Sequence, residues 1–377
     1  MTAQVNWEAS GFTHNPFNIV PDRISGDKLF WAGFPKIKEK FADIISNSLA
    51  NENSNLSLII SRYGGGKTHA SYYFSQNRNL KEDQVVPHQI MLKTPQQGKS
   101  GVQELYIAII EALKWKNICN ELRTFKETND ENSFNLLESF TKSEDIARII
   151  YLLASDDEEI VFEAQSALLG KGTNTSMKKL KIRRLITTNT DRAEVIALLI
   201  RVLSLNTPED QSKRIIIWLD ELESLIYYTS KEYRPFTQFL RELFDTSPKY
   251  LSLMLSFSFS DPTDTQNIEI VLGKALLDRV KYQIIFDEAD LIESMEYLKE
   301  LFSFYRIEEF DKGPYFPFEK VQLEQIIMKA TEESNSPMTP RTLNKWVLKS
   351  LEISAKIGID NLNKPTFLNE LDFTEEI

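Results

Sequence analysis

The sequence predicts an α/β protein with a mainly parallel, doubly wound sheet. Short apolar runs that have the length of buried strands alternate with longer segments of helical periodicity. Polar and glycine-rich residues follow directly after two of these runs, where parallel sheets place their ligands. After about residue 290 only helical patterns remain. We therefore expect a sheet core with a helical insert and a C-terminal helical unit.

The elements of the N-terminal part follow from the spacing of the apolar residues. Residues 35–50 carry them at helical spacing and predict the helix before the first strand, which is the apolar run 56–60. A glycine-rich loop then leads into a helix that begins near Lys67. A second strand is expected at 85–92 and an amphipathic helix at 101–114. This order of strands and helices is that of a parallel α/β unit.

The middle of the chain departs from strict alternation. Residues 120–200 are expected to form a mostly helical insert that interrupts the sheet order. The next strand covers 214–220, because its β-branched run is bounded by polar residues. A helix through 234–244 follows, and then a strand at 251–259. A short strand at 283–286 completes the expected sheet.

We expect three parts along the chain. The first is an extended leader, because Asn15-Pro16-Phe17 and Pro21 disfavour a helix. The second contains the sheet. The third is a helical lid, in which Thr339 caps the last long helix and Pro340 occupies its first turn. The expected boundaries are 1–30 for the leader, 31–289 for the core and 290–377 for the lid.

Composition excludes several classes of protein. The 377 residues are 42% hydrophobic and 26% charged, which is typical of a globular chain, and the longest apolar runs are too short to cross a membrane. The N-terminus lacks the layout of a secretory signal. A single cysteine, Cys119, cannot form an intramolecular disulfide and fits a reducing compartment, so we expect a cytoplasmic protein. With three histidines and one cysteine, a protein-built zinc site is not expected.

The net charge of −11 argues against a surface whose main role is to coat nucleic acid. It does not exclude a local site. The most basic stretch is 178–184, which we interpret either as a solvated surface or as a local DNA contact. In a ring of subunits, one modest basic patch on each subunit would be multiplied.

Residues 61–69 read Ser-Arg-Tyr-Gly-Gly-Gly-Lys-Thr-His and lie between a strand and a helix. Glycines at 64–66 allow successive backbone N–H groups to point toward a phosphate. Lys67 can reach the outer phosphates, and the Thr68 hydroxyl can bind Mg²⁺. Ser61 stands where the pattern G-x-x-x-x-G-K-[ST] has its first glycine, so we interpret the loop as altered rather than lost. The segment therefore predicts a nucleoside-triphosphate site.

A second motif supports this prediction. The strand 214–220 ends in Asp220-Glu221, at the edge of the sheet where the loop is expected. Asp220 would lie beside Thr68 and hold Mg²⁺, chiefly through water. Glu221 is the natural general base for an attacking water. Glu223 is interpreted as first-turn helix charge or as a group that supports the others.

These two motifs, separated by a helical insert, resemble those of AAA+ ATPases. The similarity is to the group that includes origin-recognition ATPases, transposon ATPases and the P-loop proteins of bacterial phage-exclusion (BREX-type) systems. The segments that carry it are Tyr63-Gly-Gly-Gly-Lys-Thr-His69 and Leu219-Asp-Glu-Leu-Glu223. The resemblance implies a P-loop sheet with a helical lid, ATP and Mg²⁺ as cofactors, and nucleotide contacts from Tyr63 and His69 as well as from the loop itself.

Three further positions match the family by their place along the chain. Ser256 or Ser258, at the end of the strand 251–259, matches the polar residue that touches the attacking water or the γ-phosphate. Arg279 matches an arginine directed at a neighbour's nucleotide, and Arg341 an arginine of the lid that reaches back to the nucleotide. Other interpretations stay open. The serines can be ordinary strand residues, Arg279 a partner of Asp278, Asp287 or a helix cap, and Arg341 a solvated residue.

The resemblance implies an oligomeric ATPase switch in a DNA-processing or anti-phage defence complex. We expect a homo-oligomer, a protein partner, a possible DNA contact and no membrane. In the alternative, the chain is a signalling or scaffold protein that binds ATP with little turnover and holds an effector such as a nuclease, with the insert 120–200 as its docking surface. A small-molecule kinase is disfavoured by Asp220-Glu221 and by the lid.

Overall fold

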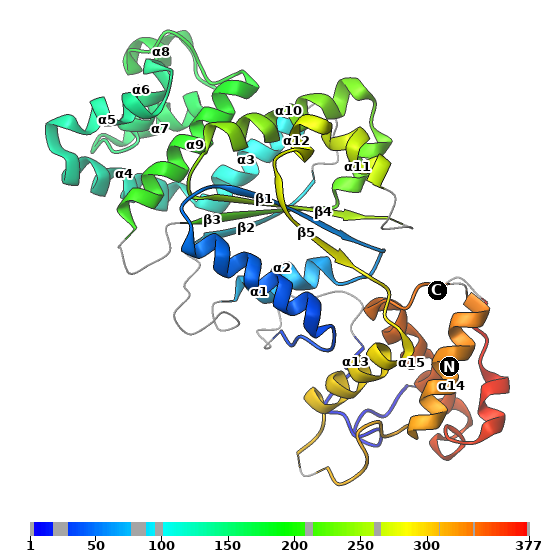
Figure 1. The fold of residues 1–377 in the computed structure, drawn as a ribbon. Coiled ribbons are helices and arrows are strands. Elements are labelled where there is room, and N and C mark those ends of the chain that lie inside the picture. The colour runs from blue at the N-terminus through cyan, green and yellow to red at the C-terminus, as the bar shows by residue number, and fades with distance from the viewer. Residues whose placement is uncertain are drawn as a thin grey trace.

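The computed structural model describes residues 4–17, 29–76, 88–94, 101–207, 214–259, 265–308, 310–334 and 336–374. Its centre is a parallel five-stranded sheet with the order β2-β3-β4-β1-β5 (Figure 1). The strands are β1 (Asn55–Ser61), β2 (His88–Lys93), β3 (Ile215–Asp220), β4 (Leu251–Ser258) and β5 (Val280–Phe286). The predicted α/β class with a mainly parallel, doubly wound sheet is confirmed.

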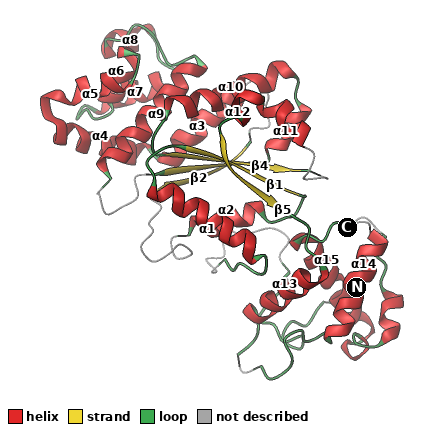
Figure 2. Cartoon of the chain, in the orientation of Figure 1, coloured by secondary structure: helices red, strands yellow, loops and turns green. Residues whose placement is uncertain are grey.

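Helices cover both faces of the sheet and form two further groups (Figure 2). Before β3 they are α1 (Pro35–Ala50), α2 (Lys67–Ser75), α3 (Gly101–Leu113), α4 (Trp115–Asn129), α5 (Ser133–Phe140), α6 (Glu144–Leu152), α7 (Glu158–Leu168), α8 (Asn174–Leu180) and α9 (Asn189–Asn206). After β3 they are α10 (Ser230–Thr246), α11 (Thr265–Leu272), α12 (Lys274–Leu277), α13 (Leu291–Phe304), α14 (Lys320–Ser334) and α15 (Pro340–Ile357). Short 3₁₀ segments are η3 (Asp130–Asn132), η4 (Leu222–Tyr227), η5 (Ile359–Asn361) and η6 (Pro365–Glu370).

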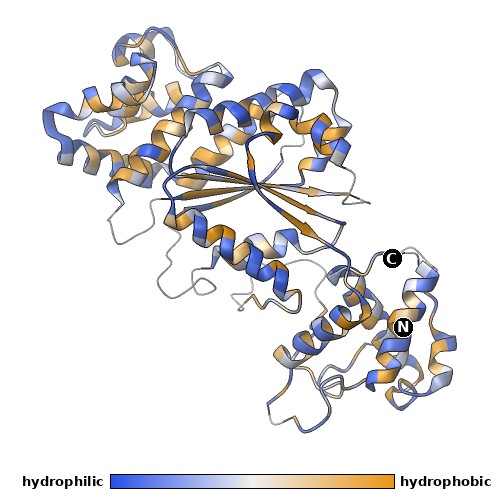
Figure 3. Ribbon diagram, in the orientation of Figure 1, coloured by the Kyte–Doolittle hydropathy of each residue, from blue (hydrophilic) through white to orange (hydrophobic). Residues whose placement is uncertain are grey.

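The two faces of the sheet bury alternate residues of each strand. In β3, Ile215, Ile217 and Leu219 pack with α3, α9 and α10, whereas Ile216 and Trp218 pack with α1 and α2. Side chains alternate between the faces of a strand, so a strand covered on both faces is apolar throughout. Figure 3 shows the result, apolar strands at the centre and helices with one apolar side.

The expected elements correspond closely to those of the structure. The helix predicted at 35–50 is α1, and the helix predicted at 101–114 is α3, one residue shorter. The strand predicted at 85–92 is described from His88 onward, and its first three positions lie outside the described residues. The predicted helical insert is the run from α4 to α9, which forms a lobe beside the sheet (Figure 1). The last strand begins at Val280, three residues before its predicted start.

The C-terminal helices form a unit beyond the end of β5, with its own core (Figure 1). The N-terminal residues 4–17 pack into this core, although they are far from it in sequence. Phe12 and Phe17 are fully buried there against Phe302, and Phe12 pairs with Arg306 in an isolated β-bridge. The leader and the helical unit therefore share one core.

No described helix is both long and apolar enough to cross a bilayer.

Candidate functional site

The glycine-rich loop follows β1 directly and turns the chain into α2. Gly64 and Gly66 have φ values of 79° and 100°, which favour glycine. At Gly65 the requirement is close packing, since an added Cβ would lie 2.8 Å from the Ser61 Cβ. The loop therefore keeps its backbone free of side chains, as a phosphate site requires.

Lys67 is the first residue of α2 and is only 6% exposed. Its ammonium donates to the Oγ of Ser61 at 2.8 Å and to the Oγ of Ser258 at 2.5 Å. Burial lowers the pKa of Lys67, while Asp220 and Glu223 act in the opposite direction. The lysine is thus a partly desolvated cation at the carboxyl end of the sheet, where an anion gains most from it.

Thr68 and Asp220 meet, although 152 positions separate them in sequence. The Thr68 hydroxyl donates to the Oδ2 of Asp220 at 2.5 Å. The other carboxylate oxygen, Oδ1, accepts the backbone N–H of Glu221 at 3.0 Å. A hydroxyl and a carboxylate oxygen at this distance are hard ligands of the kind that Mg²⁺ prefers, with water completing its shell. These two residues fit a magnesium ion.

Glu221 follows Asp220 with a left-handed backbone, at φ 63°. Its carboxylate forms an ion pair with Lys93, at the end of β2, with 2.7 Å between Nζ and Oε1. This hydrogen bond is the main reason that the pKa of Lys93 is raised. The ends of β2 and β3 are also joined by Thr94, whose N–H donates to the carbonyl of Asp220 at 2.9 Å. Lys93 is therefore a site residue that the sequence analysis did not identify.

Glu223 supports the serine that contacts Lys67. Its Oε2 accepts the backbone N–H of Ser258 at 3.0 Å. Burial raises the pKa of Glu223, against the hydrogen bonds and the charge of Lys67, which lower it. Of the two serines considered from the sequence, Ser258 therefore reaches the site. Ser256 is buried in β4 opposite Ile59 and does not line the cavity.

These groups line a cavity of about 860 Å³. Much of the remaining lining is aromatic and comes from the N-terminal segment and from α13 with its C-cap Tyr305, whereas α15 contributes Pro340, Arg341 and Asn344. His69 also lines the cavity, and its Nε2 donates to the Phe30 carbonyl at 2.9 Å. The predicted loop residues, Asp220, Glu221, Ser258 and Arg341 all line the cavity. Its apolar and aromatic wall includes Pro16, Phe30, Trp31, Phe34, Tyr297 and Tyr305.

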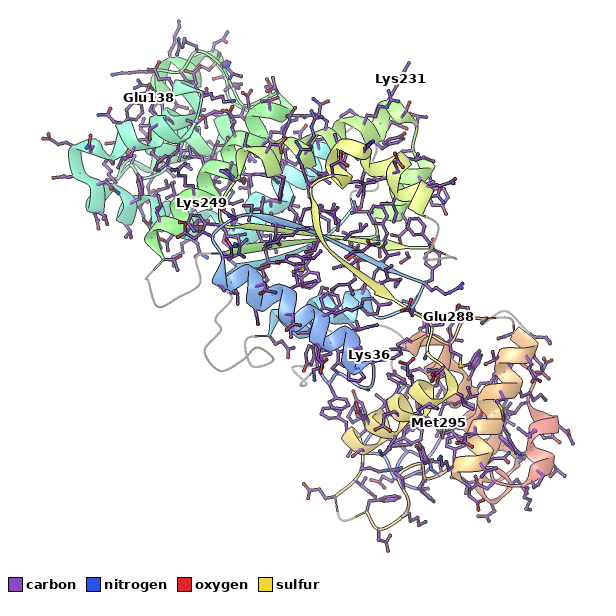
Figure 4. The ribbon with its side chains drawn as sticks, viewed as in Figure 1. Lys36, Glu138, Lys231, Lys249, Glu288 and Met295 are labelled. Carbon is purple, nitrogen blue, oxygen red and sulfur yellow. The ribbon has the colours of Figure 1, made fainter. Side chains whose placement is uncertain are left out.

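The helical unit contacts the loop directly through the start of α15. The Arg341 N–H donates to the Gly64 carbonyl at 3.4 Å, and a Cβ at Gly64 would lie 2.7 Å from the Arg341 Cβ. The Thr339 hydroxyl caps the helix by accepting the Thr342 N–H at 3.3 Å. A second link joins Arg62 to Glu288 at 2.5 Å, and Figure 4 shows Glu288 between the sheet and the helical unit.

Two exposed tyrosines, Tyr63 of the loop and Tyr227 of η4, also line the cavity. Tyr63 is 51% exposed and Tyr227, in η4, is 82% exposed. Partial burial raises the pKa of Tyr63, with further contributions from Glu223 and Tyr227. Tyr63 was expected from the sequence, whereas nothing in the apolar run of η4 indicated Tyr227.

Arg279 does not line the cavity. It lies before β5, and its guanidinium forms a bidentate pair with Asp245 of α10, at 2.6 Å and 2.8 Å. The ion-pair partners considered from the sequence were Asp278 and Asp287, but the structure places Asp245 there instead. The helix-cap alternative is confirmed, because the guanidinium also donates to the Ala275 carbonyl of α12.

The basic run 178–184 forms ion pairs within the chain. Three of its cations pair with acidic residues: Lys179 with Glu159, Arg183 with Glu144 and Asp145, and Arg184 with Asp191.

The sequence matches no protein-family model and no curated protein. Solved structures do resemble the fold. ORC2 of Aeropyrum pernix, solved in ADPNP and ADP complexes, has a TM-score of 0.50 and 11% identity, over 95% of this chain and 71% of that one. ORC1 of the same organism, solved with DNA, has a TM-score of 0.45 and 12% identity, over 96% of this chain and 69% of that one. The Pyrococcus abyssi Walker-type ATPase has a TM-score of 0.42 and 15% identity, over 93% of this chain and 73% of that one.

At these identities the likeness describes the fold alone. The chain shares the P-loop ATPase fold of ORC2, which agrees with the AAA+ fold expected from the sequence motifs.

Proposed function

We propose that this chain binds ATP with Mg²⁺ and hydrolyses it. The observation that carries the proposal is the contact of 2.5 Å between the Thr68 hydroxyl and the Asp220 carboxylate, beside a buried Lys67 in a glycine-rich loop. Lys67 and Thr68 begin α2, Asp220 ends β3, and all three line a single cavity. A triphosphate, a divalent cation and an aromatic base are the ligand parts that such a cavity suits.

Each residue has a role that its position permits. The loop N–H groups and Lys67 hold the phosphates, and Thr68 and Asp220 hold the magnesium ion, which neutralises charge on the transferred phosphoryl group. Glu221 accepts the proton of the attacking water, once its carboxylate is free of Lys93. Arg341 reaches the phosphate end of the cavity from α15. The aromatic wall of the cavity encloses the adenine base of the nucleotide.

The test is the substitution Lys67→Ala. Removing the only cation that the loop aims at the phosphates should weaken binding of an ATP analogue by about a hundredfold, since a charge-assisted contact contributes about 1.5–3 kcal/mol. Binding is measured by calorimetry with Mg²⁺ present. Lys36→Ala is a matched control, because Lys36 is an exposed cation in α1 and does not line the cavity (Figure 4). Unchanged affinity in a folded Lys67→Ala variant would refute the proposal.

We further propose that hydrolysis takes place in an oligomeric assembly of this chain. An oligomeric switch in a DNA-processing or anti-phage complex is supported by the loop resemblance and by the arginine before β5. The ion pairs of the run 178–184 weaken the case for DNA contact at that place. Steady-state ATPase rates with and without duplex DNA, over a range of protein concentrations, test both parts. A rate per subunit that responds to neither would refute the switch.

A scaffold function with little turnover is the second candidate. The ion pair between Lys93 and Glu221 favours it, because a carboxylate that is held by an ammonium is less available as a base. In that case ATP binds tightly while the hydrolysis rate stays negligible with or without DNA, and the α4–α9 lobe would be the docking surface. The same rate measurements therefore separate the two candidates.

A further inference from the structure

Ser61 is the residue at which this loop departs from the usual phosphate-binding pattern. It is the last residue of β1 and is fully buried. Its hydroxyl donates to the carbonyl of Arg62 at 2.7 Å and accepts from the Lys67 ammonium at 2.8 Å. Because the hydrogen points to Arg62, the oxygen lone pairs are left for the lysine. A glycine at this position would offer the ammonium no side-chain acceptor.

The Lys67 ammonium has three N–H donors. One goes to Ser61 and one to Ser258, which lie at the ends of neighbouring strands. Among the described residues no carboxylate lies within ion-pair distance of Lys67, although Asp220 and Glu223 are near enough to act on it. Two neutral hydroxyls therefore fix the position of this buried cation.

We propose that Ser61 is a positioning residue that holds the Lys67 ammonium against the sheet and so weakens the affinity of this site for the outer phosphates of a nucleoside triphosphate. The inference rests on the proposed function. To contact two outer phosphates, the Lys67 ammonium must give up at least one of the hydrogen bonds that it donates to the serines. Phosphate oxygens are charged and accept more strongly than a hydroxyl, so the nucleotide still binds, but the net free energy of binding is less favourable.

The two consequences of losing the hydroxyl have opposite signs. Without nucleotide, a buried cation that loses an acceptor destabilises the fold, so the melting temperature falls. With nucleotide, the competing acceptor is gone, so binding becomes tighter. One charge-assisted hydrogen bond corresponds to about a tenfold change in the dissociation constant. A residue that merely supports the fold would lower both stability and affinity.

The experiment compares Ser61→Ala with Ser57→Ala. Alanine at 61 keeps the Cβ that packs on Gly65 and removes only the hydroxyl. Ser57 lies on the same strand and is equally buried, and its hydroxyl has no partner in the described part of the chain, so it is the matched control. The probes are a non-hydrolysable ATP analogue with Mg²⁺, and AMP, which lacks the outer phosphates.

We expect Ser61→Ala to bind the ATP analogue about tenfold more tightly than the wild type, with unchanged affinity for AMP and a lower melting temperature. Ser57→Ala should keep the wild-type affinity for both probes. If Ser61→Ala binds the analogue no more tightly than a wild type that does bind it, the inference is wrong and the proposed function stands. If the folded wild type binds no ATP analogue, the proposed function itself is wrong and the inference falls with it.

Discussion

At the scale of single residues, Glu221 carries the chemical step of the proposed reaction. It follows Asp220 at the end of β3 and lines the cavity beside the phosphate loop. Glutamine keeps the shape of this side chain but accepts no proton. Glu221→Gln should therefore retain ATP binding and lose a factor of about 10²–10⁴ in turnover. Steady-state hydrolysis and analogue binding, measured on the same preparation, check this. If Glu221→Gln hydrolyses ATP near the wild-type rate, another residue must act as the general base.

Lys93 gives the companion prediction at the same scale. If the ion pair with Lys93 makes the Glu221 carboxylate less available as a general base, Lys93→Met should raise turnover and leave ATP affinity unchanged. The gain should be modest, at most about fivefold, because partly exposed ion pairs contribute only about 0.2–1 kcal/mol. A fall in turnover to the level of Glu221→Gln would instead mean that Lys93 acts on the nucleotide itself.

At the scale of elements, the end of the sheet opposite the cavity depends on Arg214. This residue precedes β3 and is 2% exposed, and burial lowers its pKa to about 10, so it stays charged at neutral pH. Its guanidinium donates to the carbonyls of Leu251 and Asn53 at 3.0 Å and 2.9 Å, and also to the Asn51 carbonyl. One side chain thus ties β3 to β4 and to the turn before β1.

Arg214→Met should destabilise the protein by about 3 kcal/mol, since buried carbonyls lose a charged donor. Thermal or urea unfolding measures the effect. Lys249→Met is the control at the same end of the sheet, where Lys249 forms an exposed ion pair with Glu52 (Figure 4). It should leave the melting temperature nearly unchanged. Equal effects of the two substitutions would show that Arg214 contributes no more than a surface ion pair.

The elements also show what the sequence could predict. The run 214–220 and the loop before α2 predicted two strand ends that lie side by side. Lys-Thr after a glycine-rich loop and Asp-Glu after an apolar run are residue pairs typical of a phosphate and magnesium site. Lys93 was not predictable, because its contact with Glu221 depends on β2 pairing with β3 across the helical insert. The aromatic wall was also missed, since Tyr297 and Phe30 look like ordinary core residues until the N-terminal segment packs against α13.

At the scale of the whole molecule, several contacts link the helical unit to the phosphate loop and to the N-terminal segment. Arg62 pairs with Glu288, the Arg341 N–H donates to Gly64, and the Gly33 N–H donates to Glu300 of α13 at 2.7 Å. The cavity therefore lies where the sheet, the N-terminal segment and the helical unit meet. A ligand that fills the cavity contacts all three, and it would shift their arrangement if it bound one arrangement more tightly than another.

Arg279 extends this reasoning to an assembly. It precedes β5, whereas the cavity lies at the opposite end of that strand, near Phe286, about 20 Å away for a strand of this length. The arginine cannot reach its own cavity, so any role in hydrolysis belongs to a neighbouring copy of the chain. In this structure Asp245 holds it in a bidentate pair. A role in a neighbour's site then requires that the guanidinium leave Asp245.

Mixing two inactive variants tests the trans role. An arginine supplied by a neighbour contributes a factor of about 10³ or more to phosphoryl transfer, so Arg279→Ala should bind ATP and lose most of its turnover. Lys67→Ala should lack turnover at ATP concentrations that are too low to occupy its weakened site. In a mixture, interfaces that pair an intact Lys67 with an intact Arg279 should recover part of the activity.

Asp245→Asn separates the trans role from a structural one. If Arg279 only stabilises α10 through its ion pair, Asp245→Asn and Arg279→Ala should lower the melting temperature alike and leave hydrolysis intact. If Arg279 serves a neighbour, Asp245→Asn frees the guanidinium, and turnover per subunit should rise at protein concentrations where Arg279→Ala stays inactive. A mixture that remains inactive although the two variants co-assemble would show that Arg279 does not act in a neighbour's site and that its role is structural.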